Sequence, residues 1–276
     1  MKSKADEIID VYPQSNFMSN CQPECIVGGK YKVLAWNMIG SVVLRDELAY
    51  TSVDVDFTNK QLHRNIVIND DFGVIMASVG YSGMILASKG AENEDGEEEM
   101  DDFIRPDGED IDMDDPEREE KKRKKYAHIQ FKPFNTWKTI KDWHFALKHN
   151  EQVECLAIGS GWCAAATDFG YLRVFSVEGV QRTIICHGTP FVTMTAYENL
   201  LAVVYHGGPS VYGAQVLKLK IIDMSTTGPT AFQTLKDIEC PVSRYSNLLW
   251  LGFSEEGQLY SYDSEGIFRG LSFRNY

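Results

Sequence analysis

The stretch that decides the fold is GWCAAATDFGYLRVFS, residues 161–176. A short apolar run is followed by a turn containing Asp168 and Gly170, and then by a second run in which buried-type and other residues alternate. Alternation at period two predicts a half-buried β-strand, and a glycine turn between two such runs predicts a hairpin. The same pattern, two strand-like runs joined by a glycine turn, recurs on both sides of this stretch.

Five hairpin-like units are visible along the chain. Their turn glycines are spaced by 43, 87, 43 and 44 residues, and the long gap contains a charged tract of 35 residues. A period of about 43 residues with several short strands per unit is typical of a β-propeller blade, which buries its faces only by stacking on its neighbours. The units are KVLAWNMIGSVVLRD (32–46), FGVIMASVGYSGMILAS (72–88), GWCAAATDFGYLRVFS (161–176), LLAVVYHGGPSVYGAQVLKLKIID (200–223) and LLWLGFSEEGQLYSYD (248–263), with turn glycines Gly40, Gly83, Gly170, Gly213 and Gly257.

The repeat predicts an all-β protein, a WD40-like β-propeller of about five recognisable blades. A β-sandwich with evenly spaced hairpins is the alternative fold. The sequence stops just after the fifth hairpin, so we expect an incomplete ring. We predict a poorly ordered N-terminal extension over residues 1–30 and a partial propeller over residues 31–276, which a disordered insertion interrupts at residues 89–125.

Composition narrows the classes of function. The 276 residues are 43% hydrophobic, have no apolar run near the roughly 20 residues of a membrane helix, and begin without the apolar region of a secretory signal. Six scattered cysteines resemble the free thiols of a cytosolic or nuclear protein. Of the net charge of −13, most comes from residues 91–125, with 17 acidic and 7 basic residues. The remainder is nearly neutral, so we expect no membrane contact and no direct DNA binding by this chain.

The charged tract ends in the basic run Lys121, Lys122, Arg123, Lys124 and Lys125. The tract lacks Ser, Thr and Tyr, so phosphorylation cannot switch it, and its composition predicts disorder. Asp115 and Pro116 form a helix-start pattern ahead of the run. The basic residues therefore have two interpretations: a nuclear-import patch, or the solvated end of a helix.

Several motifs suggest catalysis or metal binding, but each lacks the companion residues that such a site needs. Asp-Phe-Gly occurs at residues 71–73 and 168–170 without the other kinase motifs, so both copies are predicted to be turns. DIDMDD, at residues 110–115, lacks the glycine and glutamate of a calcium loop, and Cys21 and Cys25 have no second ligand pair. His144 and His206 have no partner at motif spacing. We predict no enzyme, no catalytic or metal-binding residue, no cofactor and no small-molecule substrate.

Four segments carry a resemblance to a known family. They resemble the second, middle propeller of the replisome adaptors known as WD-repeat and HMG-box DNA-binding protein, acidic nucleoplasmic DNA-binding protein, and minichromosome loss or chromosome transmission fidelity protein. The resemblance spans roughly residues 31–269 apart from the insertion. The segments are LAWNMIGSV (34–42), VECLAIGSGWCAAATDFGYLRVFSVEGVQ (153–181), LLAVVYHGG (200–208) and LLWLGFSEEGQLYSYDSEGIFR (248–269).

The resemblance implies a non-catalytic scaffold at the replication fork in the nucleus. In this family the middle propeller mediates homotrimer formation, and a following helical bundle links the GINS part of the replicative helicase to DNA polymerase alpha. This chain shows no first propeller, helical bundle or HMG box, so peptide capture and DNA binding carry over to none of its residues. A nuclear role favours the import interpretation of residues 121–125. The alternatives are a generic nuclear or cytosolic WD-like interaction scaffold and an enzyme that uses the propeller channel.

Overall fold

The computed structural model describes residues 13–21, 31–47, 50–90, 126–134, 140–148, 150–225 and 231–272. Within these ranges the regular structure consists of β-strands, labelled β1 to β19, without a helix. All of the strands belong to antiparallel sheets in which strands adjacent in sequence are hydrogen-bonded neighbours. A sheet of this kind needs only short turns, which agrees with the glycine-containing turns in the sequence.

The strands form five separate sheets, each a simple up-and-down meander. The first four sheets have four strands and the fifth has three. In order, they contain β1 (Tyr31–Trp36), β2 (Gly40–Asp46), β3 (Thr51–Phe57) and β4 (Ile66–Asn69); β5 (Val74–Val79), β6 (Gly83–Ser88), β7 (His128–Pro133) and β8 (Trp143–Ala146); β9 (Val153–Ile158), β10 (Trp162–Thr167), β11 (Tyr171–Ser176) and β12 (Gln181–Cys186); β13 (Phe191–Tyr197), β14 (Leu200–His206), β15 (Leu217–Asp223) and β16 (Thr234–Glu239); and β17 (Leu248–Phe253), β18 (Leu259–Asp263) and β19 (Phe268–Leu271).

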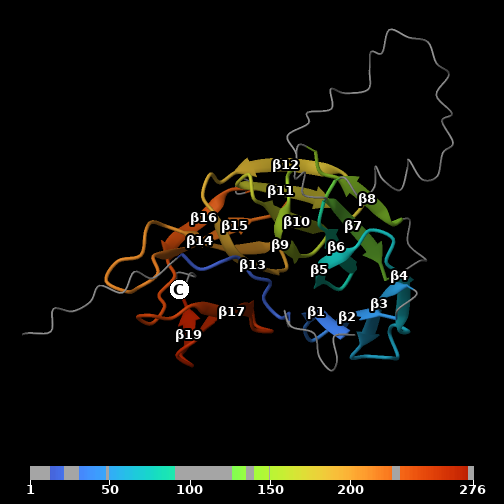
Figure 1. Cartoon of the computed structure of the whole chain (residues 1–276), viewed down its shortest axis with the longest axis horizontal. Helices are drawn as coiled ribbons and strands as arrows, with labels where there is room; N and C mark the ends of the chain where they lie inside the picture. Colours follow the sequence, from blue (N-terminus) through green and yellow to red (C-terminus); the bar gives the residue numbers. More distant parts are fainter. Residues whose placement is uncertain are drawn as a thin grey trace, which may run out of the picture.

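The five sheets are blades that follow one another around a common axis (Figure 1). The first strand of each blade packs against the first strand of the next, from β1 through β5, β9 and β13 to β17. Among the strands that the structure describes, β17 and β1 share no comparable contact. The predicted all-β propeller of five blades is confirmed.

One hydrophobic core fills the space between each pair of neighbouring blades. Four clusters of buried side chains lie between blades 1 and 2, 2 and 3, 3 and 4, and 4 and 5. Strand β10 shows how one strand serves two cores: Cys163 and Ala165 face blade 2, whereas Trp162, Ala164 and Ala166 face blade 4. All six residues of β10 are buried. Strand β10 is the neighbour of β9, the first strand of blade 3. Its small alanines let blades 2 and 4 pack closely against its two faces.

The predicted hairpins are all present, but their glycines do not mark the same turn in every blade. Gly40 and Gly83 begin the second strand of their blades and Gly257 lies just before the second strand, whereas Gly170 and Gly213 lie between the second and third strands. The first strands begin at residues 31, 74, 153, 191 and 248, so the true blade spacing is less regular than the glycine spacing. At Gly170 the backbone has a φ of 72°, a left-handed conformation that glycine adopts without steric cost.

In sequence, the charged tract falls between β6 and β7, two neighbouring strands of blade 2. Strand β6 pairs with β7 from Gly83 opposite Pro133 to Ala87 opposite Ile129, although residues 91–125 separate the two strands in sequence. The backbone N–H of His128 also donates to Ser88 Oγ at 3.0 Å. In sequence the tract thus lies between two paired strands of one blade, and residues 91–125 themselves lie outside the described residues.

Candidate interaction site

Residues 13–20, here called the axial segment, lie against the first strands of blades 3, 4 and 5. Figure 1 shows this blue segment between β13 and β17. The Phe17 N–H donates to the Val192 carbonyl at 2.8 Å. The Gln14 side-chain amide donates to the Leu248 carbonyl at 2.9 Å and accepts from the Leu248 N–H at 2.8 Å. The segment therefore satisfies backbone groups on the axial edges of β13 and β17.

The second half of the axial segment is held by buried polar contacts. Ser19 is buried, its Oγ lies 3.2 Å from Thr193 Oγ1, and it accepts the Leu251 N–H at 3.2 Å. The Met18 sulfur accepts the Leu156 N–H at 3.2 Å. These contacts reach all three blades. Since buried polar groups with partners are favourable and unpartnered ones are costly, the contacts select one position for the segment.

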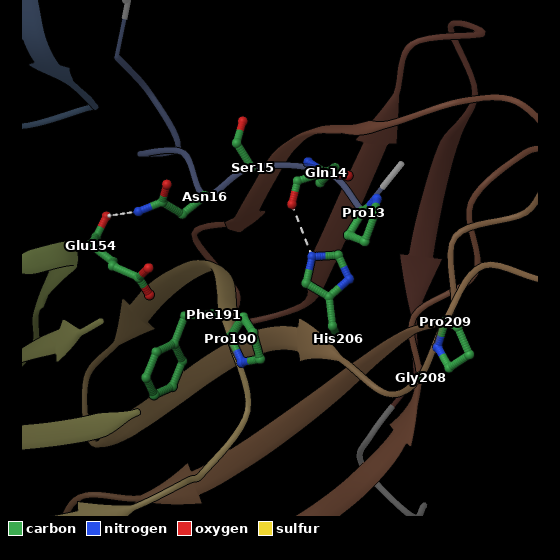
Figure 2. Close-up of a pocket in the computed structure, with 10 residues that line it drawn as sticks. All are labelled: Pro13, Gln14, Ser15, Asn16, Glu154, Pro190, Phe191, His206, Gly208 and Pro209. Carbon is green, nitrogen blue, oxygen red and sulfur yellow. Dashed lines mark hydrogen bonds between the residues drawn. The ribbon is translucent and has the colours of Figure 1, made fainter. Parts of the chain in front are cut away.

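A cavity of about 480 Å³ opens beside the start of the axial segment (Figure 2). One wall comes from the axial segment and the others come from the beginning of β9, the beginning of β13 and the end of β14. Figure 2 shows His206 below the Gln14 carbonyl and the Glu154 carboxylate on the side of Phe191. The lining residues are Pro13, Gln14, Ser15, Asn16, Glu154, Pro190, Phe191, His206, Gly208 and Pro209.

Two hydrogen bonds tie this cavity to the axial segment. Asn16 Nδ2 donates to the Glu154 carbonyl at 3.3 Å, and His206 Nε2 lies 2.9 Å from the Gln14 carbonyl. A carbonyl oxygen only accepts, so Nε2 of His206 must carry the proton of this bond. In the neutral ring Nδ1 is then an acceptor. The axial segment thereby determines the tautomer of the histidine in the cavity wall.

Glu154 is the charged group of the cavity. Burial raises the pKa of its carboxyl above the ordinary value, the negative charge of Asp168 adds to the rise, and the backbone N–H of Phe191 opposes part of it. Its Oε2 atom is buried without a hydrogen-bond partner among the described residues. A carboxylate in this environment lacks the solvation that would stabilise its charge.

A second histidine lies behind the cavity wall. His187 packs on the rings of Phe191 and Tyr205, with centroid distances of 5.1 and 4.2 Å. Burial lowers the pKa of His187 to about 4, the positive charge of Lys220 lowers it further, and Asp237 opposes the shift. Thr189 Oγ1 lies 2.7 Å from its Nδ1. The ring is therefore neutral at physiological pH and acts as packing.

Another hollow, of about 450 Å³, lies between the outer strands of blades 2 and 3. Its main charged contact is internal: Arg173 binds Glu151 through Nε at 2.8 Å and Nη2 at 2.5 Å. The rings of His128 and His144 lie 6.3 Å apart at its edge. The Arg173 guanidinium is therefore paired within the fold. Its lining consists of His128, His144, Phe145, Ala146, Lys148 and Arg173.

The described residues contain no group of three His, Cys, Asp or Glu side chains arranged to hold a metal ion. Burial holds the pKa of the Cys155 and Cys163 thiols far above the ordinary value and raises that of Cys240 to about 12. These thiols are protonated and unreactive at neutral pH. A search of the same residues for helices long and apolar enough to span a bilayer finds none.

The residues singled out in the sequence fall into three groups. The candidate import patch, Lys121 to Lys125, lies outside the described residues, and so does Cys25. The two Asp-Phe-Gly copies lie in turns, one before β5 and one between β10 and β11, as predicted. His206 and His144, interpreted as structural, line the two separate hollows.

The axial segment belongs to residues 1–30, which were predicted to be a poorly ordered N-terminal extension. The structure describes residues 13–21 of this range and shows the contacts given above. Only the apolar pair Phe17 and Met18, inside the polar stretch QSNFMSN, could have pointed to a docking segment. The cavity itself had no sequence signal, because its walls come from three distant parts of the chain.

Comparisons with known proteins show one matching family model and several similar curated proteins. Residues 19–276 match the family model described as minichromosome loss protein, Mcl1, middle region. The chain is similar to WD repeat and HMG-box DNA-binding protein 1 of Mus musculus, with 27% identity over 94% of this chain and 20% of the relative. It is also similar to protein ENHANCER OF LHP1 1 of Arabidopsis thaliana, with 30% identity over 93% of this chain and 23% of the relative.

The chain thus spans about a fifth to a quarter of the length of these curated relatives. Among solved structures, Hsv2 of Kluyveromyces lactis overlaps 96% of this chain and 75% of its own, with a TM-score of 0.45 and 8% sequence identity. The fold assignment rests on the sheet topology of the chain itself.

Proposed function

The chain belongs to the family of the minichromosome loss protein middle region, and on that premise we propose that it is a non-catalytic interaction module of the DNA replication machinery. The observation that carries the proposal is the family match over residues 19–276, on a chain folded as propeller blades. Propellers of this kind present loops and strand edges on a rigid support, which suits a scaffold.

The finer proposal is that the module mediates self-association within a longer adaptor. That adaptor would form a homotrimer and link the GINS part of the replicative helicase to DNA polymerase alpha at the fork in the nucleus. The support is the resemblance of residues 34–42, 153–181, 200–208 and 248–269 to the middle propeller of such adaptors. A generic WD-like interaction scaffold outside replication is the competing function.

Mass measurement by light scattering tests self-association. The full-length protein that contains this chain is expected to elute at three times its monomer mass, and a clean monomer at micromolar concentration would contradict the proposal. Capture of GINS and DNA polymerase alpha from nuclear extract by the same protein tests the adaptor role. Failure of both captures, with trimerisation retained, would favour the generic scaffold.

Nuclear import is tested separately. A fluorescently tagged chain in which Lys121, Lys122, Arg123, Lys124 and Lys125 are all replaced by Ala is expected to lose nuclear accumulation. The control is Lys60→Ala with Lys141→Ala, which removes two exposed lysines of the propeller. Equal nuclear accumulation of both variants would show that the basic run has no role in import.

A further inference from the structure

We propose that the cavity beside the axial segment binds the side chain of a lysine or arginine presented by a partner peptide. This inference goes beyond the proposed function, which assigns no residue of this chain to a partner. Its support comes from the size of the cavity, the charge of its lining and the hydrogen-bonding state of its walls.

The cavity has the size and the mixture of surfaces that a long basic side chain needs. Its volume of about 480 Å³ lies within the range of roughly 300–1,000 Å³ that is usual for small-ligand sites. The ring of Phe191 and three prolines provide apolar walls for an aliphatic stem. Lysine and arginine bury such stems on apolar surfaces while their charged ends reach a polar partner. The prolines are Pro13, Pro190 and Pro209.

The charge of the lining favours a cation. None of the ten lining residues is a lysine or an arginine, and Glu154 is the one carboxylate among them. Glu154 forms none of the salt bridges found in the described part of the chain. Its buried Oε2 atom has no hydrogen-bond partner there. A bound ammonium or guanidinium group would supply both the missing charge and the missing donor.

The uncharged walls also favour a donor ligand over an acceptor ligand. His206 uses its Nε2–H on the Gln14 carbonyl, so this N–H is not available to a ligand. The amide nitrogen of Gln14 is used by the Leu248 carbonyl, and that of Asn16 by the Glu154 carbonyl. One N–H of each amide is therefore occupied within the fold, and an anionic ligand would meet the Glu154 carboxylate.

The site is formed before any ligand arrives. The axial segment is anchored on both sides of the cavity, by Gln14 on Leu248 and by Phe17 on Val192. Glu154 and Phe191 are at the start of the axial strands β9 and β13, which pack against each other. Preorganised walls reduce the entropy lost on binding, so even a short peptide can bind measurably.

Two capped tripeptides test the proposal by NMR on the isotopically labelled full chain. One is Gly-Arg-Gly, and the other is Gly-citrulline-Gly, in which the guanidinium is replaced by an uncharged group of nearly the same shape. We expect saturable shifts of the Gln14, Asn16 and Phe191 amides with the arginine peptide, and at least fivefold smaller shifts with the citrulline peptide at equal concentration.

Two variants locate the interaction. Glu154→Gln is expected to weaken binding of the arginine peptide at least fivefold, and the exposed control Glu178→Gln is expected to leave it unchanged. If Glu154→Gln does not fold, the wild-type chain provides the same test, because acidification that protonates Glu154 should abolish binding of the arginine peptide. Equal shifts from both peptides, retained binding in Glu154→Gln, or shifts confined to other surfaces would each overturn the proposal. None of these readouts depends on trimer formation or on replication partners.

Discussion

The third and fifth blades are built from similar hairpins but face different surroundings. In blade 3, β10 is buried on both faces and carries small or closely packed residues, with Trp162 only 1% exposed. In blade 5, one face packs on blade 4 through Leu251, Leu259 and Leu271. Its other face carries aromatic residues. The comparison teaches that the neighbours of a blade decide which of its faces are buried and which residue types each face carries.

The uncovered face of blade 5 is a row of aromatic side chains. Trp250 lies opposite Tyr262, and Tyr262 lies opposite Phe268, so the row crosses all three strands. The rings of Trp250 and Phe268 stack at 6.1 Å, and those of Tyr260 and Phe268 at 4.9 Å. Cross-strand aromatic pairs stabilise a sheet from one face. Blade 5 therefore gains from ring stacking part of what blade 3 gains from burial on both sides.

Replacing the same residue type in each blade tests this difference most strongly. Trp162→Ala should lower the free energy of unfolding by about 3–5 kcal/mol, because it opens a cavity between two blades and leaves the Glu198 carbonyl without its 3.0 Å partner. Trp250→Ala, at a half-buried position whose indole N–H donates to Asn20 Oδ1, should cost only about 1 kcal/mol. Urea denaturation of both variants measures the contrast. Equal losses would show that burial on two faces is not what distinguishes the blades.

The buried ion pair of blade 5 allows a second test. Asp263 accepts from Arg269 Nη1 at 2.5 Å and from the Ser243 hydroxyl at 2.7 Å. Burial alone would raise the pKa of Asp263, but these bonds outweigh it and hold the pKa well below its usual range. Asp263→Ala leaves Arg269 without its carboxylate partner and should lower the free energy of unfolding by about 3 kcal/mol. The exposed control Glu265→Ala should cost little, and an equal loss in both would contradict a specific role for the pair.

The low pKa of Asp263 also sets the sign of its pH dependence. The folded state holds the carboxylate charged below the pH at which the unfolded chain protonates it. The stability that the pair contributes is therefore present above about pH 4 and is lost as the pH falls further. In Asp263→Asn this acid-side loss should be smaller, which thermal unfolding between pH 3 and 7 would measure.

A smaller effect is expected where blades 3 and 4 meet. In the unfolded chain His187 takes up its proton near its ordinary pKa of 6.5, whereas in the folded chain it remains neutral down to about 4. Acidification through this window favours the unfolded state, by on the order of 1 kcal/mol near pH 5 after allowance for partial exposure. His187→Phe should remove this dependence. Melting curves at pH 7 and pH 5 compare the two, and an unchanged slope in the variant would contradict the assignment.

The smallest expected effect has the opposite sign. Glu154 has a raised pKa, so its charged form costs stability at neutral pH, and this cost vanishes as the pH falls below the unfolded value. Glu154→Gln should therefore stabilise the chain slightly at pH 7, with no gain at pH 4. Chemical denaturation at both pH values measures it. A destabilised variant at pH 7 would mean that the carboxylate gains more from the Phe191 N–H than it loses through burial.

Local patterns in the sequence were enough to predict the blades, but they could not predict the contacts of the axial segment with blades 3, 4 and 5. The alternation of Leu217, Leu219 and Ile221 with two lysines matches the burial pattern of β15 because a strand presents successive side chains to opposite faces. The glycine repeat indicated the right fold but mixed two kinds of position. Gly170 has the left-handed backbone of a turn, whereas Gly40 begins β2, where a side chain would clash with the backbone of Asp56. A glycine therefore does not by itself report its position in the sheet.

The candidate site could not be derived in the same way. Glu154 is a single polar residue within VECLAI, and nothing beside it in sequence shows that its carboxylate borders a cavity. Pro13, Phe191 and His206 line that cavity only because the axial segment docks on strands far along the chain. Long-range contacts of this kind leave no periodic trace in the residues that make them.

The axial segment has a consequence for the order of folding. Gln14 and Leu248 are hydrogen-bonded across a separation of 234 residues, whereas the strands of each blade pair mostly with near neighbours in sequence. Closing so long a loop costs entropy that is recovered only when blades 3, 4 and 5 already present their axial edges. Residues 13–20 are thus expected to dock after these three blades have formed. Their docking then ties blades 3, 4 and 5 together along their axial edges.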